Sequence, residues 1–149
     1  MSGKEQDFIK EAFDTNWVVP LGPNVNAFEK SLRDFLIENG KLKVEDEGKQ
    51  VVALSAGTAA LHLGLILLGV QAGDEVICQS FTFCASANPV TYLGATAVFV
   101  DSEEDTWNMN PVLLEEAIRD RMAKTGRKPK AIIPVHLYGM PAKMDEICA

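Results

Sequence analysis

The chain has 149 residues, of which 47% are hydrophobic, and this is enough to build one domain with a substantial core. Its formal net charge of −7 argues against a nucleic-acid surface, because binding along phosphates requires a basic stripe. No apolar run reaches the length needed to cross a bilayer and no hydrophobic signal segment opens the sequence, so we expect a cytoplasmic protein that engages neither nucleic acid nor membrane.

The first third of the chain predicts two amphipathic helices joined by an extended segment. The first helix covers about residues 3–13, and residues 16–23 are extended because proline interrupts them twice. That segment is either a surface linker or a loop that borders a pocket. Apolar residues at helical spacing over 28–36 predict the second helix, which ends at Asn39–Gly40. Residues 41–50 are charged and predict a solvated loop.

The most informative stretch follows at residues 51–68. Val51–Leu54 is a short apolar run typical of a buried strand, and the small residues of Ser55–Ala59 lead directly into a helical pattern. The first N–H groups of such a helix are unpaired, and together with the helix dipole they form an anion site, usually for phosphate. Gly57 allows a close backbone approach and Thr58 adds a hydroxyl donor. Tight strand–helix packing is the structural alternative.

The remaining sequence alternates strands and helices. A helix is expected over 82–93, with Thr82 as its cap and Gly94 as its stop. Another begins at Asn110–Pro111, and a last one begins near Pro141. The further buried strands are predicted at 75–78, 96–100 and 131–135.

This alternation predicts an α/β fold with a mainly parallel sheet and helices on both faces. Ligands of such sheets bind beyond the carboxyl ends of the strands, so residues that follow strands can share one crevice. These residues are Ser55–Ala59, Ser80–Phe83, Asp101 and His136–Gly139.

Three cysteines, Cys78, Cys84 and Cys148, have neither the parity of a disulfide framework nor the spacing of metal ligands. We expect all three to be buried thiols in a reducing compartment, and we expect no metal site.

Several segments, taken in order and spacing, resemble one family. The chain looks like the N-terminal portion of the large domain of the DegT/DnrJ/StrS sugar aminotransferases, which are fold-type-I enzymes that use pyridoxal 5′-phosphate (PLP). The resemblance implies a partial three-layer α/β/α domain over 1–149, incomplete at its C-terminus and possibly at its N-terminus as well. The segments that carry it are 55–61, 73–77, 82–83, 94–101 and 134–142.

The resemblance assigns cofactor-binding roles. It implies that Gly57, Thr58 and Ala59 hold the PLP phosphate, in agreement with the anion-site argument, and that Phe83 stacks on the pyridine ring. An ordinary core position is the alternative for Phe83. His136 is expected at the cofactor edge, either supporting the site or making structural hydrogen bonds only.

The catalytic groups of the family are expected outside this chain. The resemblance places the Schiff-base lysine, the aspartate that pairs with the pyridine nitrogen, and a further phosphate-binding serine beyond residue 149. Lys143 lies on the correct edge of the sheet, but the resemblance assigns it no such role. The family topology also places strand 51–54 at the far end of the sheet, with its neighbours supplied by later sequence. We therefore expect no catalytic residue in this chain and weak or absent PLP binding by it alone.

The implied whole protein is a homodimer that transfers an amino group from glutamate to a nucleotide-linked keto sugar, in the synthesis of amino sugars for polysaccharide or lipopolysaccharide. Two alternatives stay open. One is a PLP-dependent sugar dehydratase of the same family, and the other is a non-catalytic phosphate-binding or interaction domain.

Overall fold

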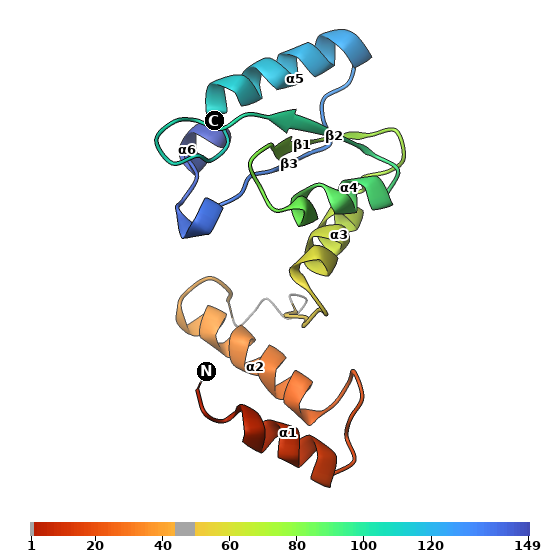
Figure 1. Ribbon diagram of the computed structural model, residues 1–149, viewed down its shortest axis with the longest axis vertical. Helices are drawn as coiled ribbons and strands as arrows, with labels where there is room; N and C mark the ends of the chain where they lie inside the picture. The colour runs from red at the N-terminus through yellow and green to blue at the C-terminus, as the bar shows by residue number, and fades with distance from the viewer. Residues whose placement is uncertain (1, 44–49) are drawn as a thin grey trace. The chain divides into compact units, whose positions relative to one another are not determined.

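The computed structural model describes residues 2–43 and 50–149, in two compact units, Met1–Leu54 and Ser55–Ala149 (Figure 1). Most of the charged loop predicted over 41–50 therefore lies outside the described residues. None of the described helices is both long enough and apolar enough to cross a bilayer.

The first unit contains the two predicted helices, α1 (Glu5–Asp14) and α2 (Pro23–Glu38). The segment between them was predicted to be extended but instead turns at residues 15–16 and bends over 19–22, and its Trp17 indole donates a hydrogen bond to the carbonyl of Leu21 at 2.6 Å. This ring fills the space at Gly22, where an added Cβ would lie 1.9 Å from the Trp17 Nε1. The glycine is therefore required by close packing.

The strand predicted at Val51–Leu54 is wrong for this chain, because these residues have no regular secondary structure and belong to no sheet. A strand needs the hydrogen bonds of a neighbouring strand, and the described residues supply none beside this segment. The Ala53 N–H instead donates to the carboxylate of Glu29 in α2, at 2.8 Å. The apolar composition of this segment predicted a strand but carries no information on strand pairing.

The second unit is built on a three-stranded parallel sheet of β1 (Glu75–Gln79), β2 (Thr96–Val100) and β3 (Ala131–Ile133). The order is β2-β1-β3, so β1 is central, with Ile77 beside both Val98 and Ile132. The parallel sheet predicted from the strand–helix alternation is confirmed.

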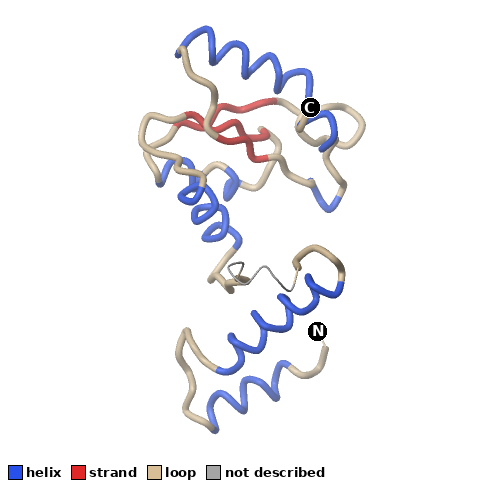
Figure 2. Tube along the Cα trace, turned by 180° about the vertical axis from the view of Figure 1, so that it is seen from behind, coloured by secondary structure: helices blue, strands red, loops and turns tan. Residues whose placement is uncertain are grey.

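Helices cover both faces of this sheet, as Figures 1 and 2 show. Val76 and Cys78 point into a core with α3 (Gly57–Leu67) and α4 (Asn88–Tyr92), whereas Ile77 faces the opposite core. That second core includes residues of α5 (Pro111–Thr125) and α6 (Met144–Ile147). The period-2 alternation of a strand thus places β1 at the centre of an α/β/α sandwich.

The single helix predicted over 82–93 is wrong in its first half. A short 3₁₀ turn, Cys84–Ser86, precedes α4, which has Pro89 in its first turn. Proline has no N–H to donate, so it starts a helix well but cannot continue one. Gly94, with φ of +69°, ends the helix as predicted.

The start of α5 is confirmed in detail. The Asn110 side chain accepts hydrogen bonds from the N–H groups of Val112 and Leu113, at 2.9 and 3.3 Å. Gly126 ends the helix in the left-handed conformation, with φ of +72°. After β3, a short 3₁₀ turn spans Leu137–Gly139.

Candidate functional site

The N-terminus of α3 leaves its first backbone N–H groups without a partner inside the helix. Its first backbone hydrogen bond within the helix runs from the Ala60 N–H to the Ala56 carbonyl, at 3.2 Å. The N–H groups of Gly57, Thr58 and Ala59 precede that bond, and the extended Ala56 offers no side-chain cap to them. A Cβ added at Gly57 would meet no atom within 4 Å, so this turn faces open space.

This helix start lines a cavity of about 780 Å³ in the second unit. The Phe83 side chain also lines it and is 77% exposed, which rules out the ordinary core position considered for this residue. Thr82 bonds to the buried Ser86 through their hydroxyls at 2.8 Å, which fixes the segment carrying Phe83. The lining residues are Gly57, Thr58, Leu61, Phe81, Thr82, Phe83, Ala85, Ser86, Val135, Leu137 and Tyr138.

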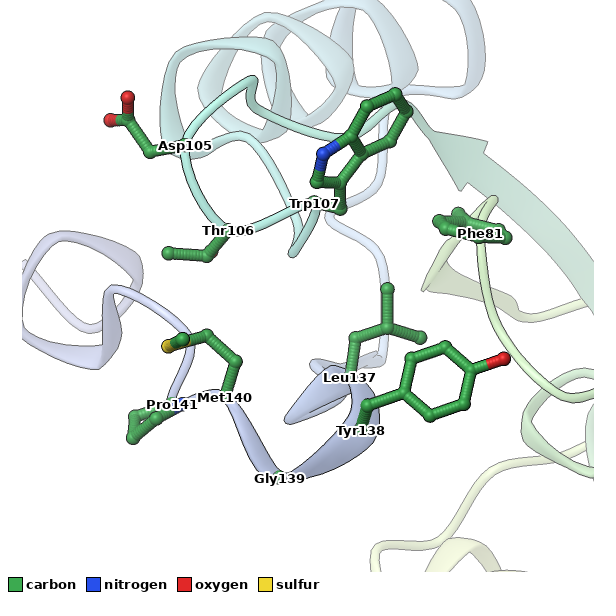
Figure 3. Close-up of a pocket in the computed structure, with 9 residues that line it drawn as sticks. All are labelled: Phe81, Asp105, Thr106, Trp107, Leu137, Tyr138, Gly139, Met140 and Pro141. Atoms are coloured by element: carbon green, nitrogen blue, oxygen red, sulfur yellow. The ribbon is translucent and has the colours of Figure 1, made fainter.

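A second hollow of about 840 Å³ adjoins the first and shares Phe81, Leu137 and Tyr138 with it (Figure 3). It is walled by residues 105–107 on one side and residues 137–141 on the other. None of the residues that line this hollow belongs to the first turn of an α-helix, so the smaller cavity is the better site for an anionic cofactor.

The two strand-end polar residues lie outside both cavity linings. Asp101 accepts hydrogen bonds from the Ser80 hydroxyl at 3.2 Å and from the Ser102 N–H at 2.8 Å, and the first of these bonds joins the ends of β1 and β2. The His136 Nδ1 accepts from the Ala142 N–H at 2.9 Å. Both side chains make structural bonds here, and a cofactor role for His136 stays a prediction.

Sequence reasoning missed two buried amides beneath the site, Gln79 and Asn108, which are both 0% exposed. Gln79 donates to the carbonyls of Phe81 and Trp107, and it accepts from the Met109 N–H at 2.8 Å. Because two of the three partners of each amide are distant in sequence, no local pattern signals these residues.

An ion cluster holds the loop that follows β2. The buried Glu103 accepts from the N–H groups of Asp105 and Thr106, from the Thr106 hydroxyl and from Lys143, whose Nζ lies 3.2 Å away. The Thr106 hydroxyl contributes most to lowering the Glu103 pKa, to about 2.

Lys143 is held in its charged form by the same cluster. Its hydrogen bond to Asp105, at 3.1 Å, and then the one to Glu103 raise its pKa. A lysine that forms a Schiff base needs a neutral amine, and therefore a lowered pKa. Lys143 is thus a structural cation.

The three cysteines differ, contrary to the expectation that all are buried. Cys78 is buried in β1, and its desolvation raises the thiol pKa to about 11. Cys84 and Cys148 are exposed. Cys84 opens a one-turn 3₁₀ helix and Cys148 directly follows α6.

Comparison with known proteins agrees with this arrangement. The sequence model of the DegT/DnrJ/EryC1/StrS aminotransferase family matches residues 1–149. Among solved structures, a DegT DnrJ EryC1 StrS aminotransferase from Brucella abortus superposes with a TM-score of 0.80 at 37% identity, over 96% of this chain and 35% of that one. The sequence match and the structural match therefore indicate the same family.

Two curated relatives are similar over 99% of this chain. EpsN of Bacillus subtilis, provisionally named a pyridoxal phosphate-dependent aminotransferase, is 52% identical over 147 residues. The GDP-perosamine synthase of Caulobacter vibrioides is 41% identical over 147 residues. The chain belongs to the DegT/DnrJ/EryC1/StrS aminotransferase family, and it spans about 35% of the length of these two relatives.

Proposed function

We propose that the complete protein is a PLP-dependent aminotransferase that moves an amino group from glutamate to a nucleotide-linked keto sugar. The observation that carries this proposal is the open α3 N-terminus on the same cavity as Phe83, within a chain that matches the family along its whole length. Relatives named for GDP-perosamine and for a UDP-linked 3-oxo-glucuronate support this substrate class. The product would be an amino sugar for polysaccharide synthesis.

The residues of the cavity fit the cofactor. Bound PLP supplies the electron sink that this chemistry requires. In our proposal, the N–H groups of Gly57, Thr58 and Ala59 and the Thr58 hydroxyl bind its phosphate. The bare Cα of Gly57 leaves room for the phosphate oxygens, since an added Cβ would project into open space. The exposed Phe83 ring stacks on the pyridine ring and excludes water from that face.

The proposal extends to the parts of the protein that this chain does not contain. A Schiff-base lysine and an acid that pairs with the pyridine nitrogen would come from the remaining two thirds of the length typical of the relatives. A cytoplasmic homodimer is the proposed state of the whole protein. Sedimentation of the complete protein tests the dimer directly.

Cofactor binding by variants of the complete protein tests the assignment. We expect Thr58→Ala to weaken PLP binding by roughly tenfold to a hundredfold, since a hydrogen bond to a charged group contributes about 1.5–3 kcal/mol. Phe83→Ala should weaken it by about twofold to tenfold through lost stacking. Thr96→Ala and Phe99→Ala are matched controls, because both residues are exposed on β2 and line neither cavity. Unchanged affinity in both site variants would remove these assignments.

Turnover tests the reaction itself. The complete protein, with PLP and glutamate, should convert a GDP- or UDP-linked keto sugar to the amino sugar, and form 2-oxoglutarate in equal amount. Mass spectrometry of the sugar nucleotide and an assay for 2-oxoglutarate follow both products. Loss of water from the sugar without amine transfer would identify a dehydratase instead.

A further inference from the structure

We infer that Asn108 is a positioning residue that sets one wall of the cofactor cavity, an inference that rests on the proposed function. Asn108 touches neither cavity and lies on the loop after β2. Its side-chain amide reaches across to the loop after β3, which supplies the cavity residues Leu137 and Tyr138. The hydrogen bonds of one buried side chain thus join two loops that are distant in sequence.

The side chain of Asn108 uses both ends of its amide. Its Oδ1 accepts from the Leu137 N–H at 2.8 Å, and its Nδ2 donates to the Met140 carbonyl at 2.9 Å and to the Thr106 hydroxyl at 3.0 Å. The bonds to Leu137 and Met140 lie on either side of Tyr138 and Gly139. They therefore fix both ends of the turn that projects into the cavity.

The backbone of residues 137–140 needs hydrogen bonds from outside the turn to keep its conformation. Tyr138 has a φ of +49°, in the left-handed region that a tyrosine rarely adopts, and its side chain is 97% exposed. Packing of the Tyr138 side chain therefore does not fix the turn. Figure 3 shows residues 137–141 facing residues 105–107 across the larger hollow, and Asn108 directly follows this second segment.

The backbone around Asn108 is itself fixed by hydrogen bonds within its own loop and to the end of β1. Its carbonyl accepts from the Glu103 N–H at 2.9 Å, and Ser102 and Met109 form an antiparallel bridge that closes its loop. The Met109 N–H donates to the buried Gln79 at the end of β1. The position of the cavity wall is therefore set from the central strand through Gln79, Met109 and Asn108.

The test compares PLP affinity in the complete protein with hydrogen exchange at the Leu137 N–H. Asn108→Ala should weaken PLP binding at least about fivefold and speed exchange at Leu137, because the variant leaves buried polar groups unpaired. Asn108→Asp has the same shape, keeps the acceptor for Leu137 and loses the donor to Met140. It should retain protection at Leu137 and have an intermediate affinity, and it carries the test if the alanine variant does not fold.

Arg121→Gln is the matched structural control. Arg121 makes two hydrogen bonds to Glu75, at 2.9 and 2.6 Å, at the opposite end of β1 from the cavity. This variant should lower the stability of the fold but leave PLP affinity and Leu137 exchange unchanged. An equal loss of affinity in Arg121→Gln would show that general destabilisation is the cause and would overturn the inference.

Two other outcomes separate the inference from the proposed function. If the unaltered protein binds PLP and Asn108→Ala binds it equally well, the positioning role is wrong and the proposed function stands. If the unaltered protein shows no PLP absorbance, the proposed function is overturned and the inference falls with it.

Discussion

Glu103 shows how one carboxylate can organise a loop. It is buried, yet it stays charged because N–H and hydroxyl donors and Lys143 surround it. Its pKa in the folded chain, about 2, lies below its ordinary 4.5. Since the folded state binds this proton less readily than the unfolded state, Glu103 stabilises the fold above about pH 4.5.

That contribution should be lost as the pH falls from about 4.5 to about 2. Glu103→Gln should lower the melting temperature at neutral pH, and the difference from the unaltered chain should narrow through this window. Melts followed by circular dichroism at a series of pH values provide the measurement. Glu104→Gln, at an exposed neighbouring position, is the control. A difference that stays constant with pH would contradict the prediction.

The cysteines give a second test at the scale of single residues. In the native chain at neutral pH, a thiol reagent should modify Cys84 and Cys148 rapidly and Cys78 only after unfolding. Burial both blocks access to Cys78 and raises its pKa to about 11, so little thiolate forms there. Peptide mass spectrometry after timed labelling locates the modified residues. Rapid modification of Cys78 in folded protein would show that the β1 core opens.

Among the elements, α5 has the most clearly defined start. Asn110→Ala removes the acceptor used by Val112 and Leu113 and should cost about 1 kcal/mol of unfolding free energy. Asn110→Asp keeps an acceptor oxygen and should be close to the unaltered chain. Urea titrations of the three proteins measure the difference. Equal stability of the alanine variant would mean that packing on β2 alone fixes this helix.

Local chemistry predicted the elements that depend on local interactions. The Asn110 cap, the Gly94 stop and the strands β1 and β2 follow from nearby residues, and all are present. The predicted burial holds for β1 but not for β2, where Thr96 and Phe99 are exposed. The segment 51–54 is different, because its apolar residues indicate extended backbone but pairing depends on a neighbouring strand. Within the helix predicted over 82–93, Pro89 lies in the first turn of α4, so the helix begins at Asn88 and not at Thr82.

The residues of the candidate site likewise fall into those that the sequence predicted and those that only the structure shows. Gly57 and Thr58 were predicted from a small-residue turn before a helix and Phe83 from the family resemblance, and all three line one cavity. Asn108 and Gln79 were missed, since their hydrogen-bond partners come from loops that only the fold brings together. Contacts between distant loops leave no periodic signal in a single sequence.

For the molecule as a whole, the two units differ in how much apolar surface they bury. The second unit has a core on each face of its sheet. In the first unit, no residue of α1 or α2 is buried, and the Phe8, Phe13, Phe28 and Phe35 side chains are all more than half exposed. Exposed apolar surface of this extent is typical of a contact surface.

We expect the isolated 149-residue chain to bind PLP weakly or not at all. Three hydrogen bonds to the phosphate, each of about 1.5–3 kcal/mol, are largely offset by association costs of about 4–15 kcal/mol. Absorbance titration with PLP measures the affinity, and borohydride reduction followed by mass spectrometry tests for a covalent link. A pyridoxyl adduct on Lys143 would contradict our assignment of that residue as a structural cation.

The open start of α3 has a consequence for mutational surveys. Alanine substitution does not remove a binding site that is formed by backbone N–H groups. Ala59 is already alanine, so an alanine scan would not change it. Such a scan would report only the Thr58 hydroxyl and overlook the rest of the turn. A larger side chain is the informative substitution at this turn. Gly57→Val would fill the space in front of the α3 N-terminus, which alanine substitutions leave open.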